Sequence, residues 1–185
     1  MRAFVAVELP AEIKNQIAAV QADLKRIPAQ VSWVKPGNIH VTLKFLGEVP
    51  EDKIQEVFTA TEAGCKGAKK FRMGLKGLGG FPNLQRPRVI WVGTAAGEKE
   101  ITELQEKVEK EIEKMGFPRE ERKFTPHFTI GRIKMPKGAE ELSQAVGKIE
   151  FATEEFEVNE VVVMQSQLNP TGAIYTPLKK IVLEA

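Results

Sequence analysis

The sequence sets out its elements in the same order twice, and this repetition limits the folds that it can adopt. In the first half, an apolar run at residues 2–8 predicts a buried strand. The next segment carries a helical stripe of apolar residues from Ile13 to Ile27, with steps of three and four. A strand at 39–47 and a shorter helix at 50–64 complete the first set.

The second half follows the same plan. After a glycine- and proline-rich segment at 79–87, which predicts a loop, residues 88–94 predict a strand. An apolar stripe at 101–115 predicts a long helix, and a strand at 124–133 and a short helix at 139–147 follow. The shared order indicates an internal duplication.

The remaining segments predict only strands, at 31–34, at 70–78, twice within 148–168, and at 173–185. Several successive strands are joined by short turns, which favours antiparallel pairing. We therefore predict an α+β fold over residues 1–185, a single domain of two lobes related by a pseudo-twofold axis. Each lobe would be a mostly antiparallel sheet with outer helices, and a cleft would lie between the sheets.

The composition is that of an ordinary globular protein, with 42% hydrophobic and 28% charged residues. No apolar run approaches the roughly 20 residues of a membrane span, and the first ten residues lack the layout of a signal peptide. A single cysteine, Cys65, allows neither an intrachain disulfide nor a cysteine metal cage. The net charge of +2 is too small for a dedicated nucleic-acid coat protein. We expect a cytoplasmic monomer that does not bind membranes.

The only two histidines of the chain lie in two copies of one short pattern. Both His40 and His127 are followed, two residues later, by a threonine, Thr42 or Thr129. Because strand side chains alternate between faces, each strand would present an imidazole and a hydroxyl side by side. The intervening and following apolar residues would point into the core.

Two such strands facing across a cleft would suit chemistry at phosphorus. An imidazole gives or takes a proton near neutral pH, and a hydroxyl donates a hydrogen bond to an oxyanion. One base could activate the attacking oxygen while one acid protonates the departing oxygen. Single strand histidines are more often structural, but a chance repeat of the whole pattern is improbable. Zinc is a further alternative, although two histidines without a third clustered ligand make a poor zinc site.

At these residues the sequence resembles the RNA 2′,3′-cyclic phosphodiesterases, also known as 2′-5′ RNA ligase-like proteins, of the 2H phosphoesterase superfamily. The resemblance rests on "WVKPGNIHVTLKFLG" and "FTPHFTIGR" around the two histidines. It extends to "RAFVAVELP", "RPRVIWVG" and "SQLNPTGAIY", so that it covers nearly the whole chain in the same order.

The resemblance implies hydrolysis of a terminal 2′,3′-cyclic phosphate on RNA to a 2′-phosphomonoester, with no cofactor and no metal. It implies His40 as proton donor, His127 as proton acceptor, and Thr42 and Thr129 as ligands of the non-bridging phosphate oxygens. Side-chain chemistry alone leaves open which histidine is the acid. tRNA fragments are among the RNAs that the resemblance suggests as substrates.

Four further residues are candidates for substrate binding. By strict alternation Lys44 shares a face with His40, whereas Arg132 faces the core unless Gly131 introduces a bulge. Tyr175 and Trp33 could stack on a base of single-stranded RNA. The other large aromatic side chains near these strands are predicted to be core residues: Phe4, Phe45 and Trp91.

Three other functions remain open at this point. The same acid and base could run the reaction in reverse and join RNA ends through a 2′-5′ linkage. A module that binds RNA ends without turnover is the second, although binding an anion does not need two titrating groups. A small cyclic nucleotide or an ADP-ribose cyclic phosphate could replace RNA as the substrate.

Overall fold

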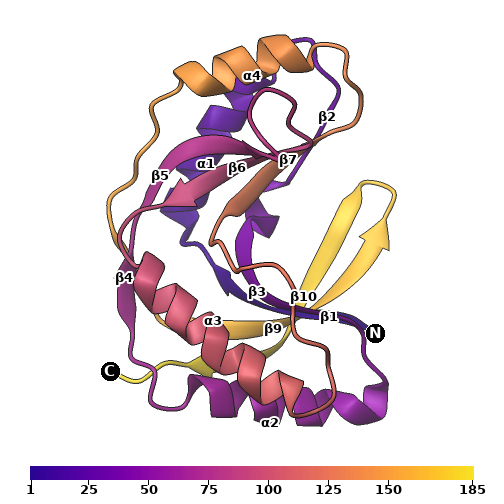
Figure 1. The fold of residues 1–185 in the computed structure, drawn as a ribbon, viewed down its shortest axis with the longest axis vertical. Coiled ribbons are helices and arrows are strands. Elements are labelled where there is room, and N and C mark those ends of the chain that lie inside the picture. Colours follow the sequence, from indigo (N-terminus) through magenta and orange to yellow (C-terminus); the bar gives the residue numbers. More distant parts are fainter.

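The computed structural model describes residues 1–185 and contains two four-stranded antiparallel sheets with helices on their outer faces (Figure 1). Sheet A has the strand order β10-β9-β1-β3, with β1 (Arg2–Glu8), β3 (His40–Glu48), β9 (Glu160–Asn169) and β10 (Gly172–Val182). Sheet B has the order β2-β7-β6-β5, with β2 (Val31–Trp33), β5 (Leu75–Phe81), β6 (Val89–Thr94) and β7 (Phe128–Ile133). The predicted α+β fold of two repeated lobes is confirmed.

The long helices cross between the lobes. Helix α1 (Ala11–Leu24) follows β1 of sheet A, but its Gln21 side chain is hydrogen-bonded to strand β7 of sheet B. Helix α3 (Glu98–Glu113) follows β6 of sheet B, but it contacts β3 of sheet A and lies against α2 (Ile54–Cys65). Helix α4 (Ala139–Lys148) contacts β5 and α1. The long helix of each half therefore packs on the sheet that holds the other half's histidine strand, whereas α2 and α4 contact the sheet of their own half's histidine strand.

The apolar residues form one large cluster and one small one. The large cluster of 34 buried residues includes Val5 and Val7 of β1 and the apolar stripes of the helices. The small cluster contains Phe4, Ala6, Val162 and Met164, which face the other side of sheet A. Because neighbouring positions of β1 belong to different clusters, the strand separates the helix-covered face of sheet A from the face turned toward sheet B.

A β-bulge in β3 reverses two of the sequence predictions. Thr42 pairs with Ala6, but Val5 pairs with Lys44, so Leu43 is an extra residue on β3. Lys44 consequently faces the helices and is 5% exposed, so its predicted place beside His40 is wrong. Phe45 was predicted to be a core residue, yet it pairs with Phe4 and is 65% exposed.

A second bulge occurs at the corresponding place in β7. Trp91 pairs with Thr129, but Ile90 pairs with Gly131, so Ile130 is the extra residue. Arg132 then pairs with Val89 and shares the face of Thr129. The alternative in which a bulge turns Arg132 toward the cleft is therefore the one that the structure adopts.

Smaller differences concern strand boundaries. The single strand predicted at 70–78 is two strands, β4 (Phe71–Met73), which pairs with β8 (Phe156–Val158), and β5. Strand β5 continues through Gly79 and Gly80, where a loop was predicted; the Trp91 ring lies so close to Gly79 that a Cβ there would clash. Strand β7 begins only at Phe128, after Pro126, which lacks an N–H for a ladder.

Two short turns and one long hairpin complete the description of the chain. Residues Pro36–Asn38 and Glu51–Lys53 form 3₁₀ turns that precede β3 and α2. The hairpin of β9 and β10, yellow in Figure 1, extends beyond the body of the molecule at the tip near residue 170. None of the helices is both long enough and apolar enough to span a membrane.

Candidate active site

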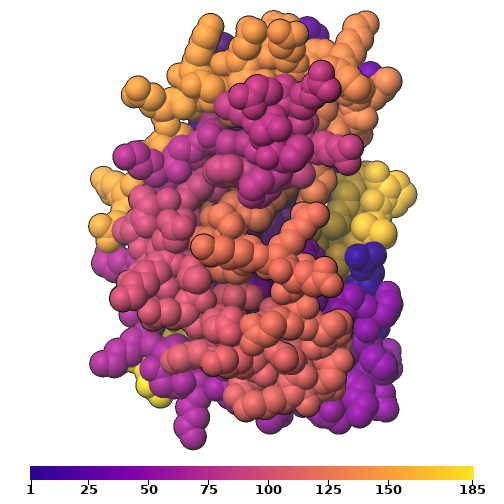
Figure 2. Space-filling model, in the orientation of Figure 1, coloured from indigo at the N-terminus to yellow at the C-terminus, as the bar shows by residue number.

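A cleft of about 1150 Å³ lies between the two sheets, and both histidine strands line it. His40 and Thr42 reach it from β3, and His127 and Thr129 reach it from β7. The segment between α3 and β7 forms a further wall, and Figure 2 shows this segment, in orange, lying across the middle of the face between the lobes. The residues that the sequence pattern singled out therefore meet in one cavity.

The two imidazole rings are held in the same way. The Nδ1 atom of His40 lies 2.7 Å from the carbonyl oxygen of Asn38, and Nδ1 of His127 lies 2.7 Å from that of Thr125. A carbonyl oxygen only accepts hydrogen bonds, so Nδ1 carries a proton in both rings. Nε2 is consequently the atom that gains or loses a proton as either ring titrates, and the two rings use equivalent atoms for proton transfer.

His40 lies in an aromatic pocket. Its ring stacks on Phe4 with a centroid distance of 4.8 Å. It also makes an edge-to-face contact with the Tyr175 ring, with a centroid distance of 5.3 Å. Burial lowers the pKa of His40, and the positive charge of Lys14 adds to this, although the hydrogen bond to Asn38 opposes it. His40 Nε2 also lies 2.9 Å from the Thr42 hydroxyl, which donates to the neutral ring.

His127 has a more open setting with aromatic side chains on one side. The edge-to-face contact with Phe81 has a centroid distance of 4.8 Å, and Trp91 lies at 6.4 Å. The backbone carbonyl is its hydrogen-bond partner, so that Nε2 remains available to a ligand.

Three of the four additional candidates line the cleft, although Lys44 is almost fully buried. Arg132 and Tyr175 both line it, and they are near enough that the Arg132 charge lowers the pKa of Tyr175, while burial raises that pKa more strongly. Trp33 does not line the cleft. Its indole packs over Gly131 on the core side of sheet B, so the predicted stacking of Trp33 on a base is wrong. Trp91, predicted to be core, is partly exposed near His127 instead.

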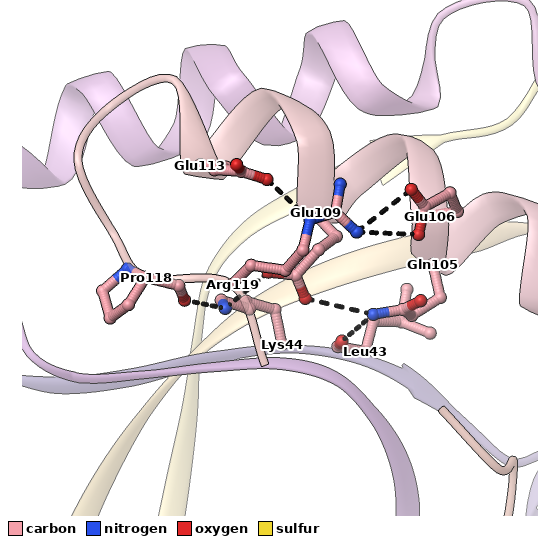
Figure 3. A network of polar contacts seen from close by, with 8 residues as sticks. All are labelled: Leu43, Lys44, Gln105, Glu106, Glu109, Glu113, Pro118 and Arg119. Atoms are coloured by element: carbon pink, nitrogen blue, oxygen red, sulfur yellow. Dashed lines mark hydrogen bonds and ion pairs between the residues drawn. The ribbon is translucent and has the colours of Figure 1, made fainter. Parts of the chain in front are cut away.

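Lys44 is committed to a buried network rather than to the substrate (Figure 3). Its ammonium is 2.7 Å from Glu109 Oε1 of α3 and donates to the Pro118 carbonyl oxygen, also at 2.7 Å. Gln105 donates to Glu109 Oε2 at 3.2 Å. On the surface next to it, Arg119 bridges two further carboxylates of α3. The network fastens the segment that leads to His127 onto α3 and β3.

Several residues of the site have no clear signal in the sequence. Phe81 lies within the segment 79–87 that reads as a loop, and Asn38 looks like an ordinary turn residue. Phe45 is hidden by the bulge, because regular alternation places it in the core. No group of three or more His, Cys, Asp or Glu side chains is arranged to hold a metal ion.

Two lobes that each present a histidine and a threonine to a shared cleft define a class of protein, the bilobal two-histidine phosphoesterases. The description "LigT like Phosphoesterase" belongs to the family model that matches this chain, once at residues 7–91 and again at 92–175. The chain belongs to this family. The two matches also support the internal duplication.

Several curated relatives carry the name RNA 2′,3′-cyclic phosphodiesterase, among them the following two. The protein from Methanothermobacter thermautotrophicus is 36% identical over 180 residues, covering 97% of both chains. The protein from Aquifex aeolicus is 38% identical over 154 residues, covering 82% of this chain and 81% of the relative.

Solved structures of similar proteins share the fold. TT0787 of Thermus thermophilus has a TM-score of 0.80 at 29% identity, covering 99% of this chain and 98% of that one. Escherichia coli LigT complexed with 3′-AMP has a TM-score of 0.79 at 26% identity, covering 98% and 97% of the two chains.

Proposed function

We propose that this protein hydrolyses the 2′,3′-cyclic phosphate at the end of an RNA to a 2′-phosphomonoester, using its two histidines as acid and base without a metal. The observation that carries the proposal is the duplicated arrangement of the rings. Both donate Nδ1–H to a carbonyl two residues earlier, and both line one cleft with a threonine beside them. Residues 1–185 would act as one two-lobed unit, because the long helix of each half packs on the sheet that holds the other half's histidine strand.

In the proposed reaction, a water attacks phosphorus opposite the 3′ oxygen. His127 Nε2 takes a proton from the water as the new P–O bond forms. The bond from phosphorus to the 3′ oxygen breaks, and His40 Nε2 gives its proton to that oxygen. Burial lowers the pKa of His40, which makes its protonated form a stronger acid. The negative phosphate stabilises that protonated form when substrate is bound.

The relatives support the choice of substrate. Each of the two curated relatives is named for RNA 2′,3′-cyclic phosphates, and LigT of Escherichia coli has been crystallised with 3′-AMP. The cleft volume of about 1150 Å³ is ample for more than a phosphate group. Arg132 and Tyr175 at its wall offer a positive charge and an aromatic face, the chemistry that holds single-stranded RNA.

The decisive experiment uses an oligonucleotide that ends in a 2′,3′-cyclic phosphate, incubated with the protein and excess EDTA. Hydrolysis adds one water to the mass and yields a phosphate that a 3′-phosphatase cannot remove. Adding an RNA with a 5′-hydroxyl tests for end joining, which would give a longer product. Tight binding without any product would leave only a module that binds RNA ends, and loss of turnover with EDTA would contradict the metal-independent mechanism.

The two threonines provide a separate test of phosphate binding. We expect Thr42→Val and Thr129→Val each to lower kcat/KM by about 10²- to 10³-fold, the typical cost of losing one oxyanion donor. Valine keeps the shape of the strand residue, so the folded structure should persist. Thr59→Val is a matched control, because its hydroxyl bonds only within α2. Wild-type rates in both cleft variants would show that the threonines serve only the strands.

The exposed ring of Phe45 predicts a contact with the RNA. Phe45 lies on the cleft wall next to Phe4, with a centroid distance of 6.0 Å, and is 65% exposed. A base stacked on such a ring typically contributes about 1–3 kcal/mol. We expect Phe45→Ala to raise KM for an oligonucleotide roughly 10-fold with little change in kcat, whereas Val182→Ala, at an exposed apolar position outside the cleft, changes neither. Equal KM values for all three proteins would remove Phe45 from the binding surface.

A further inference from the structure

Two buried glutamines occupy equivalent places in the two halves of the molecule. Gln21 lies on α1 and is 1% exposed, and Gln105 lies on α3 and is 7% exposed. A side-chain amide is rarely buried without a hydrogen-bond partner, because removing the amide from water is unfavourable. Neither residue takes part in the acid–base chemistry, so their burial needs another explanation.

Each glutamine donates to the carbonyl oxygen of a bulged residue. Gln21 Nε2 lies 2.9 Å from the carbonyl oxygen of Ile130, and Gln105 Nε2 lies 3.3 Å from that of Leu43. Ile130 and Leu43 are the extra residues of the two bulges, and each directly follows the threonine of its motif. The second partner is also an acceptor in each case, the Val34 carbonyl for Gln21 and Glu109 for Gln105. Acceptors on both sides require the NH₂ end of each amide to face them.

The glutamines act across the duplication. Gln21 comes from the first half of the chain and holds the histidine strand of the second half. Gln105 comes from the second half and holds the histidine strand of the first. A bulge interrupts the ladder of a strand, and it persists only where other groups satisfy the freed backbone. The buried amides supply a donor at both places, and at Ile130 the backbone N–H of Val34 also donates to the same carbonyl oxygen, at 3.0 Å.

We propose that Gln21 and Gln105 are positioning residues that fix the two bulges and thereby the placement of the catalytic strands. Each bulge sets where the preceding threonine and histidine stand relative to the opposite strand. It also turns the third residue after the threonine, Phe45 or Arg132, toward the cleft. The proposal goes beyond the proposed function, although its kinetic test rests on that function.

The variants Gln21→Met and Gln105→Met remove the donors and keep most of the volume. We expect each to lower kcat about 10- to 100-fold, since small displacements of catalytic groups have effects of this size. Thr61→Val is the matched control for a lost buried hydrogen bond, because the Thr61 hydroxyl is fully buried and bonds only to Val57 of α2. A fall in kcat no larger than that of Thr61→Val would overturn the proposal.

A spectroscopic readout separates positioning from a general loss of stability. The chain has only two histidines, so each imidazole signal in an NMR spectrum reports one catalytic strand. Gln105→Met should shift the His40 signal and leave that of His127, and Gln21→Met should do the reverse. Thr61→Val should move neither signal. Unchanged signals in both glutamine variants would also overturn the proposal.

A further variant covers the case in which Gln21→Met does not fold. In Gln21→Glu, an ionised carboxylate would face two carbonyl oxygens, whereas the protonated acid could still donate to one of them. We expect the midpoint of thermal unfolding to rise toward that of the wild type as the pH falls. A constant difference from the wild type between pH 8 and pH 5 would contradict the proposed donor role. The NMR and unfolding measurements need no turnover, so they remain informative even if the RNA assay shows no hydrolysis.

Discussion

Replacing either histidine should reduce turnover of an RNA 2′,3′-cyclic phosphate by at least about 10³-fold. General acid and base groups each contribute roughly 10²- to 10⁴-fold, and this site has one of each in the proposed mechanism. We expect His40→Asn and His127→Asn to remain folded, because both side chains line the cleft instead of filling the main core. Initial rates with the cyclic-phosphate oligonucleotide, with circular dichroism as the control for folding, measure the effect.

The double variant should be little worse than the poorer single one. In the proposed mechanism acid and base act in one concerted displacement, so that losing one removes most of the benefit of the other. If the two losses multiplied, the histidines would contribute independently, for instance to binding alone. If either single variant kept more than a tenth of the activity, that histidine would not transfer a proton in the slow step.

The dependence of the rate on pH should show whether both rings transfer protons. A pair with one acid and one base gives a bell, and kcat/KM reports the free enzyme. The lower of the two pKa values sets the acidic limb whichever ring is the acid, so the lowered pKa of His40 places the acidic limb of kcat/KM below the usual imidazole value of about 6.5. The bound phosphate raises that pKa, so the acidic limb of kcat should lie at higher pH than that of kcat/KM. A profile with a single titration would show that only one of the two rings transfers a proton.

Local sequence patterns correctly predict the directions in which the first four side chains of each motif point. The repeated His-x-Thr-x segment follows regular alternation, which correctly turns His40 and Thr42 away from the large core. Alternation then fails after Leu43 and Ile130, because each of them is an extra residue in its strand. In β7 the glycine at 131 suggested a bulge, but in β3 the equivalent position is Lys44, which gives no such hint. The bulges depend on tertiary partners such as Gln105, which lies 62 residues away in the chain.

The crossing of the helices was equally hidden from the sequence. The periodicity of α1 and α3 shows which face of each helix is apolar, but not which sheet that face covers. The positions of Gln21 and Gln105 within otherwise apolar stripes were available in the sequence, yet a single glutamine on a helix is unremarkable. Trp33 was misplaced because an aromatic residue next to a motif can point to either side of its strand.

The largest effect on stability is expected at Lys44. Its ammonium and the Glu109 carboxylate are 2.7 Å apart, with side-chain exposures of 4% and 2%. Lys44→Met should lower the free energy of unfolding by about 3–5 kcal/mol, because it leaves a buried carboxylate without its cation. Urea unfolding followed by tryptophan fluorescence measures the change. The surface pair of Lys53 and Glu56 is a matched control, and Lys53→Met should cost less than about 1 kcal/mol.

The double variant Lys44→Met/Glu109→Gln tests the cause. It removes both charges, and the new amide can still accept the hydrogen bond from Gln105. Buried ion pairs replaced as a pair are often neutral in stability, so most of the loss in Lys44→Met should be recovered. Recovery would identify the unpaired charge as the source of the loss. If the double variant were as unstable as Lys44→Met, the lost bond to the Pro118 carbonyl, which fastens the segment leading to His127, would be the dominant contribution instead.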